Sequence, residues 1–259
     1  MSNEAWNYVI SPPPQAALAV AGSDKVFPVR RLWCVGRNYV EHIKEMGQDV
    51  REPPFFFAKP SDAIVPDGGT APYPSLTKDL HHEVELVVAL KSGGRNIPVA
   101  KANDCIYGYG VGIDLTRRDL QIASRDIKRP WEIGKAFDHS APCGALRPAS
   151  EIGHPTKGRI VLKVNGKVRQ DGDLNQMIWN DPEVISKLSE MVELAPGDII
   201  MTGTPSGVAA TVAGDKIECE VEGVGTLNVT IGQPLKKGRH SETTKPLAAV
   251  PRSRLCQSP

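Results

Sequence analysis

The feature that most constrains the fold is the segment from residue 83 to residue 90, which reads Glu-Val-Glu-Leu-Val-Val-Ala-Leu. Its second half is apolar enough to lie in the middle of a β-sheet. Side chains two positions apart on a strand share one face, so Glu83 and Glu85 should point the same way, with Cα atoms about 6.6 Å apart. Two carboxylates that enter an apolar sheet together repel each other unless a positive charge lies between them.

Further short segments predict a mixed, β-rich α+β fold with short helices and many turns. Asn165-Gly166 stands between two short alternating stretches, a pattern typical of a β-hairpin. Strand-like alternation or a high content of β-branched residues also occurs in residues 31–36, 107–115, 198–202, 216–221 and 225–231. Residues 53–74 are rich in proline and glycine, and we expect irregular chain there.

Three short helices are expected from capping patterns. The first follows Asn38 and ends near Gly47, the second follows Thr116, and the third runs from Asp181 to about Met191. In the third helix, Asp181 is the expected N-cap and Pro182 the first helical residue.

Length and composition favour one catalytic domain that acts on a small molecule. We expect an extended arm over residues 1–26, the domain over residues 27–235 and a disordered tail over residues 236–259. The chain has 31 Lys and Arg residues against 30 Asp and Glu residues, so no net field attracts nucleic acid or an anionic membrane. The five cysteines lack zinc-site spacing, and no apolar run approaches the roughly 18 residues of a membrane span. These features together predict a cytoplasmic protein.

The Glu-x-Glu pair indicates a metal site. Mg2+, Mn2+ and Ca2+ prefer oxygen ligands, and a pair of glutamates can converge on one such ion if a third ligand joins them. Asp114 ends the glycine-alternating segment 107–113, whose small side chains leave space around it, and is the natural third ligand. The alternative is a solvent-exposed strand face with no metal, and the local pattern alone leaves both interpretations open.

Four groups of residues, one of which contains this pair, resemble the signature series of the fumarylacetoacetate hydrolase superfamily. The matching stretches are residues 82–86 (His-Glu-Val-Glu-Leu), 112–121 (Gly-Ile-Asp-Leu-Thr-Arg-Arg-Asp-Leu-Gln), 134–138 (Gly-Lys-Ala-Phe-Asp) and 202–208 (Thr-Gly-Thr-Pro-Ser-Gly-Val). Their order and spacing agree over roughly residues 27–232. The resemblance implies a β-sandwich roll with short helices, and a homodimer.

The resemblance also implies roles for individual residues. The metal ligands would be Glu83, Glu85 and Asp114, with Mg2+ or Mn2+ as the cation. Arg118, Gln121, Lys135 and Thr204 would surround the substrate, and Lys135 would stabilise the negative charge that develops on it. The helix after Asn38 matches the one that closes over the site, where Glu45 could orient His42 as general base. Without the resemblance, His42 and Lys135 would be interpreted as surface residues and Thr204 as the start of a turn. Likewise, Arg118, Gln121 and Arg125 would form a solvated helix face, the interpretation we keep for Arg117 and Asp126.

The activity that the resemblance implies is hydrolysis of a carbon–carbon bond in an acylpyruvate. Residues 6–14 and 52–62 are most similar to the group that cleaves fumarylpyruvate in gentisate-type aromatic breakdown. There, a second carboxylate on the substrate could meet Arg37, Arg118 or Arg125. The alternatives are decarboxylation of oxaloacetate, isomerisation of an unsaturated oxo-diacid, or metal binding without catalysis on the same fold.

Overall fold

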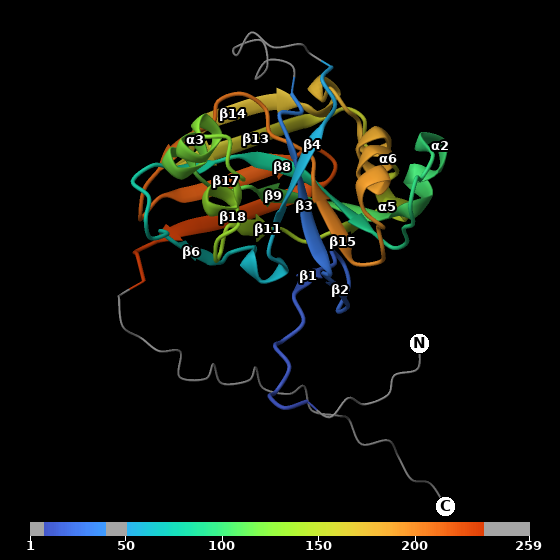
Figure 1. Cartoon of the computed structure of the whole chain (residues 1–259), viewed down its shortest axis with the longest axis horizontal. Coiled ribbons are helices and arrows are strands. Elements are labelled where there is room, and N and C mark those ends of the chain that lie inside the picture. The colour runs from blue at the N-terminus through green and yellow to red at the C-terminus, as the bar shows by residue number, and fades with distance from the viewer. Residues whose placement is uncertain (1–7, 40–50, 236–259) are drawn as a thin grey trace, which may run out of the picture.

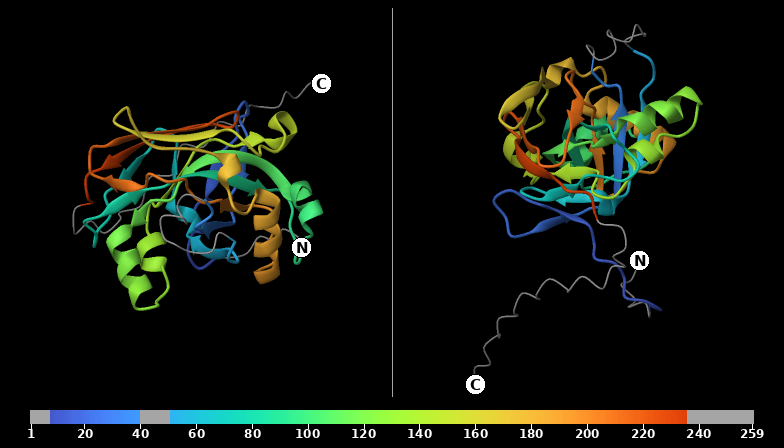
Figure 2. Two further views of the ribbon diagram at one scale, coloured as in Figure 1. Left: turned by 90° about the horizontal axis from the view of Figure 1, so that it is seen from above. Right: turned by 90° about the vertical axis from the view of Figure 1, so that its left-hand side faces the viewer.

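A computed structural model describes residues 8–39 and 51–235. Most of the predicted helix after Asn38, with His42 and Glu45, therefore lies outside the described residues, as does the predicted tail. The described chain forms two curved sheets that face each other, with short helices at the edges (Figures 1 and 2). This arrangement confirms the predicted mixed, β-rich class.

The larger sheet carries the Glu-x-Glu strand in its interior. Its strands lie in the order β4 (Phe55–Lys59), β3 (Arg31–Gly36), β15 (Asp198–Met201), β8 (Val84–Leu90), β9 (Ile106–Ile113), β11 (Ala141–Cys143) and β5 (Ile64–Pro66), and β12 (Arg147–Pro148) also pairs with β9. Every residue of β8 is buried, because β15 and β9 flank this strand and both of its faces are covered.

The second sheet covers one face of the first. Its order is β14 (Lys167–Asp173), β13 (Arg159–Val164), β17 (Lys216–Val221), β18 (Gly225–Gly232) and β6 (Thr70–Pro72). The main core lies between the sheets, where Leu86 and Val88 of β8 belong to the same buried cluster as Ile160 and Leu162 of β13. Burial of this apolar surface is the main force that holds the two sheets together.

A smaller core lies on the other face of β8. Val87 and Ala89 share it with Leu18 of β1 (Ala17–Ala19) and Phe27 of β2 (Val26–Pro28), two strands that form an antiparallel pair. Glu85 continues the side-chain alternation of Val87 and Ala89, so its carboxylate belongs to this face.

The remaining elements are short. A three-stranded sheet has the order β10 (Thr116–Arg117), β7 (Leu80–His82) and β16 (Ala209–Thr211). The α-helices are α2 (Val99–Ala102), α3 (Arg118–Asp126), α4 (Glu132–Lys135), α5 (Ala149–Ile152) and α6 (Asp181–Met191). The 3-10 helices are η1 (Ser61–Ala63), η2 (Asn103–Cys105) and η3 (Leu174–Gln176).

The predicted hairpin and the predicted third helix are both present, but the N-cap of that helix is one residue earlier than predicted. The hairpin between β13 and β14 turns at Asn165 and Gly166, whose φ angles of 52° and 75° suit a two-residue turn. The N-cap of α6 is Asn180, one residue before the predicted Asp181, because the Asn180 side chain accepts the Glu183 amide. Pro182 is therefore the second helical residue.

Two other predictions were wrong. Residues 53–74 are not irregular, because β4, β5 and β6 each pair with a strand distant in sequence. Thr116 does not cap α3, because it belongs to β10 and its hydroxyl donates to the Asp114 carbonyl oxygen.

Candidate metal and substrate site

The pairing of β8 with β9 brings three carboxylates together. Glu83 immediately precedes β8 and Asp114 immediately follows β9, so both lie at one end of this antiparallel pair. The Asp114 amide donates to the Glu83 carbonyl oxygen at 2.8 Å, which holds the two backbones in register. Together with Glu85, each residue offers a carboxylate oxygen within 4.8 Å of the others, and all three side chains are buried.

Two buried lysines lie against these carboxylates. The Lys135 Nζ donates to Glu83 Oε2 at 2.8 Å, to Asp114 Oδ2 at 2.6 Å and to Thr116 Oγ1 at 2.7 Å. The Lys59 Nζ lies 2.8 Å from the other Asp114 oxygen, Oδ1. Asp114 is therefore bracketed by two ammonium groups, one at each carboxylate oxygen.

Lys59 also connects the strands and helices of the site. Its Nζ donates to the carbonyl oxygens of Leu115 at 3.0 Å and Lys135 at 2.5 Å. One side chain on β4 thus fixes both the chain after Asp114 and the end of α4, which carries Lys135.

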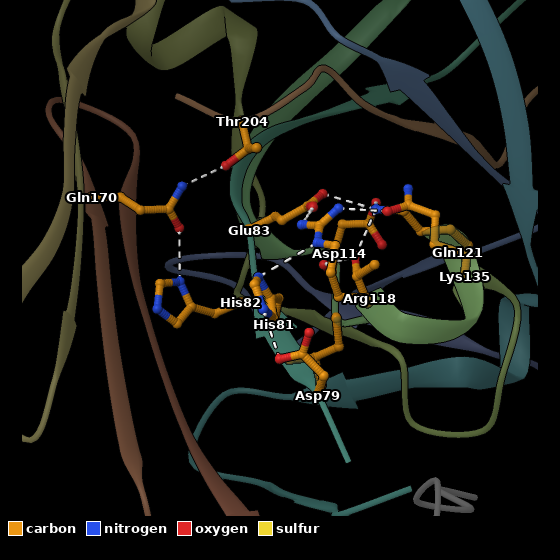
Figure 3. A network of polar contacts seen from close by, with 12 residues as sticks. Asp79, His81, His82, Glu83, Asp114, Arg118, Gln121, Lys135, Gln170 and Thr204 are labelled. Carbon is orange, nitrogen blue, oxygen red and sulfur yellow. Dashed lines mark hydrogen bonds and ion pairs between the residues drawn. The ribbon is translucent and has the colours of Figure 1, made fainter. Parts of the chain in front are cut away.

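Arg118, the first residue of α3, is the second cationic residue that contacts Glu83, after Lys135 (Figure 3). Its guanidinium contacts Glu83 Oε1 and donates to Gln121 Oε1. Its Nε lies 3.4 Å from Nδ1 of His81, whose Nε2 in turn lies 2.9 Å from Asp79. His81, which has no cluster spacing in the sequence, therefore supports the orientation of Arg118.

The close approach of α3 and α4 depends on a glycine. A Cβ added to Gly134 would lie 2.8 Å from the Cβ of Gln121, closer than side chains pack. Glycine at this position therefore lets Gln121 and Lys135 face the same site from two helices.

The carboxylates differ in their electrostatic surroundings. Burial raises the pKa of Glu85 well above its usual range, and the nearby charges of Asp114 and Glu83 raise it further. Burial also opposes ionisation of Glu83, but Lys135 and Arg118 outweigh it and lower the Glu83 pKa. Burial disfavours the charged form of Lys135, yet Asp114 and Glu83 outweigh it and raise the Lys135 pKa, so the ammonium form persists.

These charges fit a hard divalent cation. Glu85 accepts a hydrogen bond from the Gly203 amide at 2.7 Å, but no lysine or arginine among the described residues forms an ion pair with it. A cation held by all three carboxylates would supply the missing positive charge and favour ionised Glu85. The structure thus confirms that the predicted triad can bind one divalent metal.

The loop after β15 forms another wall of the site. Gly203 has a φ of 98°, a conformation that side chains rarely adopt, and this turn directs its amide at Glu85. The next residue, Thr204, accepts a hydrogen bond at 2.8 Å from Gln170, whose Oε1 lies 3.0 Å from Nδ1 of His82 (Figure 3). Gln170 therefore fixes this loop to the strand that leads into Glu83.

A pocket of about 220 Å³ opens above the carboxylates. Arg37, Arg125 and Trp131 line it together with the triad. The Trp131 ring packs edge-on against Phe55 with centroids 5.0 Å apart, so one wall is aromatic. The pocket is therefore acidic at its floor and basic towards its mouth, which suits a small anion that also reaches a metal.

Comparison with known proteins identifies the family. The profile of the family described as fumarylacetoacetate (FAA) hydrolase C-terminal matches residues 31–232. The chain belongs to the fumarylacetoacetate hydrolase family. This match covers every strand of both large sheets and the whole triad.

Relatives in this family carry two different activities in their names. A fumarylpyruvate hydrolase of Ralstonia sp is 42% identical over 181 residues, which is 70% of this chain and 94% of that protein. The mitochondrial oxaloacetate tautomerase FAHD1 of Rattus norvegicus is 42% identical over 204 residues, 76% of this chain and 92% of that protein.

Solved structures support the same family. The crystal structure of fumarylpyruvate hydrolase from Pseudomonas aeruginosa, in complex with Mn2+ and pyruvate, is 50% identical with a TM-score of 0.85. The alignment covers 88% of this chain and all (100%) of that one. The fold predicted from the motifs, a fumarylacetoacetate hydrolase-type roll, is therefore confirmed.

The structure brings the predicted site residues of the described chain into one pocket. They are Arg37, Glu83, Glu85, Asp114, Arg118, Gln121, Lys135 and Thr204. His42 and Glu45 lie outside the described residues, so their role as base and orienter stays a prediction. The residues that the motifs did not single out are Lys59, Gln170 and His81, which hold the site from outside it.

Two further features bear on the predictions. Arg117 is not part of a solvated face, because its guanidinium packs over the Phe137 ring at 4.3 Å from the centroid. Within residues 8–39 and 51–235, no helix is long and apolar enough to cross a membrane.

Proposed function

We propose that this protein is a divalent-metal-dependent acylpyruvate hydrolase that converts fumarylpyruvate to fumarate and pyruvate, as in gentisate-type aromatic catabolism. The observation that carries this proposal is the buried Glu83, Glu85 and Asp114 triad beneath a pocket with a basic rim. The Ralstonia relative of that name and the Pseudomonas structure with Mn2+ and pyruvate support it. In keeping with the family resemblance, we also propose a cytoplasmic homodimer.

The proposed cofactor is Mg2+ or Mn2+, held by Glu83, Glu85 and Asp114. When bound, such a cation supplies a Lewis acid that polarises the oxo acid and holds it in one orientation. Arg118, Gln121 and Thr204 line the walls around it, so their donors orient the substrate oxygens.

The reaction uses a base and a cation of this chain. His42, oriented by Glu45, removes a proton from water, and the oxygen attacks the C4 carbonyl. Lys135 stays charged between Glu83 and Asp114, so it stabilises the negative charge that develops on the C4 oxygen. The C3–C4 bond then breaks, the acyl part leaves as an acid, and C3 takes up a proton to become the methyl group of pyruvate.

The second carboxylate of fumarylpyruvate distinguishes it from acetylpyruvate. Arg125 lines the pocket and its side chain is exposed, so its guanidinium is accessible to a substrate anion. Its ion pair in the structure is with the neighbouring, exposed Asp126. We propose that Arg125, together with Arg37, which also lines the pocket, binds this carboxylate.

A second candidate, tautomerisation of oxaloacetate, rests on the identity with the FAHD1 relative. Decarboxylation of oxaloacetate would use the same cation site. Isomerisation of an unsaturated oxo-diacid would use the same cation site. Steady-state assays with fumarylpyruvate, acetylpyruvate, oxaloacetate and an unsaturated oxo-diacid separate these activities. We expect the highest kcat/KM for fumarylpyruvate.

Replacement of Arg125 by leucine tests the specificity within that panel. We expect kcat/KM for fumarylpyruvate to fall by about 10-fold or more, because a charge-assisted hydrogen bond is lost, while acetylpyruvate is unaffected. Arg129→Leu, an exposed residue that does not line this pocket, is the matched control. A higher kcat/KM for oxaloacetate than for fumarylpyruvate would refute the proposed substrate.

A further inference from the structure

A second cavity, of about 290 Å³, lies at the first turn of α6 and shares no lining residue with the metal pocket. Residues of η2, β9, η3 and α6 line it. Helix α3 beside the metal pocket and α6 beside this cavity lie at opposite sides of the molecule (Figures 1 and 2). The cavity is therefore separate from the proposed hydrolase reaction.

The cavity contains a buried carboxylate that lacks a partner. Asp181 is only 4% exposed, and no described residue donates a hydrogen bond to its Oδ1. It does not serve as the cap of α6, because Asn180 accepts the Glu183 amide in that role. A buried polar group without a partner is costly, so an unpaired carboxylate oxygen in a residue that lines a cavity is a sign of a missing donor.

A second unpaired acceptor lines the same cavity. The side-chain oxygen of Asn103, on η2, is buried and accepts no hydrogen bond from the described chain. Neither lysine nor arginine is among the described residues that line the cavity. The polar part of the cavity thus has an excess of acceptors and calls for a positively charged donor.

The other walls define the shape of such a donor. Leu174, Met177, Pro155 and Pro182 give the cavity an apolar side. Tyr109 and His154 pair with each other, with Tyr109 Oη 2.7 Å from His154 Nδ1, so their contact leaves Asp181 unsatisfied. The volume is at the lower end of the range for small-molecule sites.

We propose that this cavity binds a small aliphatic primary amine in its ammonium form. The ammonium group donates to Asp181 and to the Asn103 carbonyl oxygen, and the alkyl part lies along Leu174 and Met177. A cation here also favours the ionised carboxylate, which burial otherwise opposes. Water molecules alone would satisfy the two acceptors. They would leave the negative charge of Asp181 uncompensated and the apolar side of the cavity in contact with water.

Titration calorimetry with n-butylammonium chloride at pH 8, on the full chain, tests the proposal. We expect saturable binding that weakens about 10- to 100-fold in Asp181→Asn, which keeps the shape but removes the charge. Asn103→Leu should also weaken binding. Glu190→Gln, which changes an exposed carboxylate on the same helix, should leave it unchanged.

Three outcomes would overturn the proposal. The first is the absence of saturable binding to the wild type. The second is binding of butylammonium to Asp181→Asn and Asn103→Leu with the same affinity as to the wild type. The third is displacement of butylammonium by potassium chloride at equal ionic strength. Butan-1-ol, which lacks the charge, should bind far more weakly. Hydrolysis of fumarylpyruvate should continue in Asp181→Asn, so failure of the amine site and failure of the hydrolase assignment are distinguishable.

Discussion

Lys59 supports the metal site, although it belongs to none of the sequence motifs that predicted the site. Its ammonium group pairs with Asp114 Oδ1 and holds the backbone at Leu115 and Lys135. Because groups behind a metal ligand orient it, Lys59→Met should weaken Mn2+ binding by about 10- to 100-fold. Calorimetry of the metal-stripped protein measures this directly.

The controls separate orientation of the ligand from general damage to the fold. Lys91→Met removes an exposed lysine and should bind Mn2+ like the wild type. Lys59→Arg, which keeps the charge, should recover part of the affinity, and near-ultraviolet circular dichroism should show that each variant is folded. Unchanged Mn2+ affinity in a folded Lys59→Met protein would show that Asp114 needs no such partner.

The burial of Asp181 should make the stability of the protein depend on pH. Burial raises its pKa from 3.8 to about 7 in the folded protein. Its contribution to stability is therefore fully present below pH 3.8 and is lost as pH rises through about 7, at a cost on the order of 4 kcal/mol. Asp181→Asn should gain stability relative to the wild type between pH 5 and pH 8, as urea unfolding can measure. The same difference at both pH values would contradict the raised pKa.

The sequence pattern predicted the three carboxylates but not the side chains that hold them in place, such as Lys59 and Gln170. Glu83 and Glu85 are two positions apart on a strand, so the spacing itself places them on one face. Lys59 reaches carbonyl oxygens that lie 56 and 76 residues away in sequence. Gln170 contacts His82 across 88 residues. Such contacts depend on how strands pair in space, and no local pattern encodes them.

At the scale of elements, the contact between α3 and α4 sets the distance between Gln121 and Lys135. Gly134→Ala would place a Cβ 2.8 Å from Gln121 Cβ, so the helices must separate. We expect a loss of about 1–3 kcal/mol in stability and a lower kcat, because Lys135 moves with α4. Gly225→Ala is the matched control, since a Cβ there meets nothing within 4 Å. A variant with wild-type kcat and unfolding free energy would show that α4 can shift without moving Lys135.

The elements that could be predicted are those whose signals are local. The hairpin at Asn165 and Gly166 follows from residues that accept positive φ, and β3 follows from a short apolar run that ends on glycine. Strand β4 was missed because prolines flank it, and it exists through its pairing with β3. The N-cap of α6 was displaced by one residue because Asn180 and Asp181 are both good capping residues.

At the scale of the whole molecule, the packing of the two large sheets holds three carboxylates together at one end of β8 and β9. The homodimer, the cytoplasmic location and the boundaries of the arm and tail stay predictions, as do the roles of His42 and Glu45. The central claim is that a cation held by the triad is needed for carbon–carbon hydrolysis.

The most direct test of that claim is proton NMR of fumarylpyruvate turnover during stepwise addition of Mn2+ to the chelated protein, with bound metal measured by elemental analysis. We predict no hydrolysis without metal, and a rate that rises with bound Mn2+ to saturation at about one ion per chain, with equal amounts of fumarate and pyruvate. Full hydrolysis by protein that contains no detectable metal would contradict it.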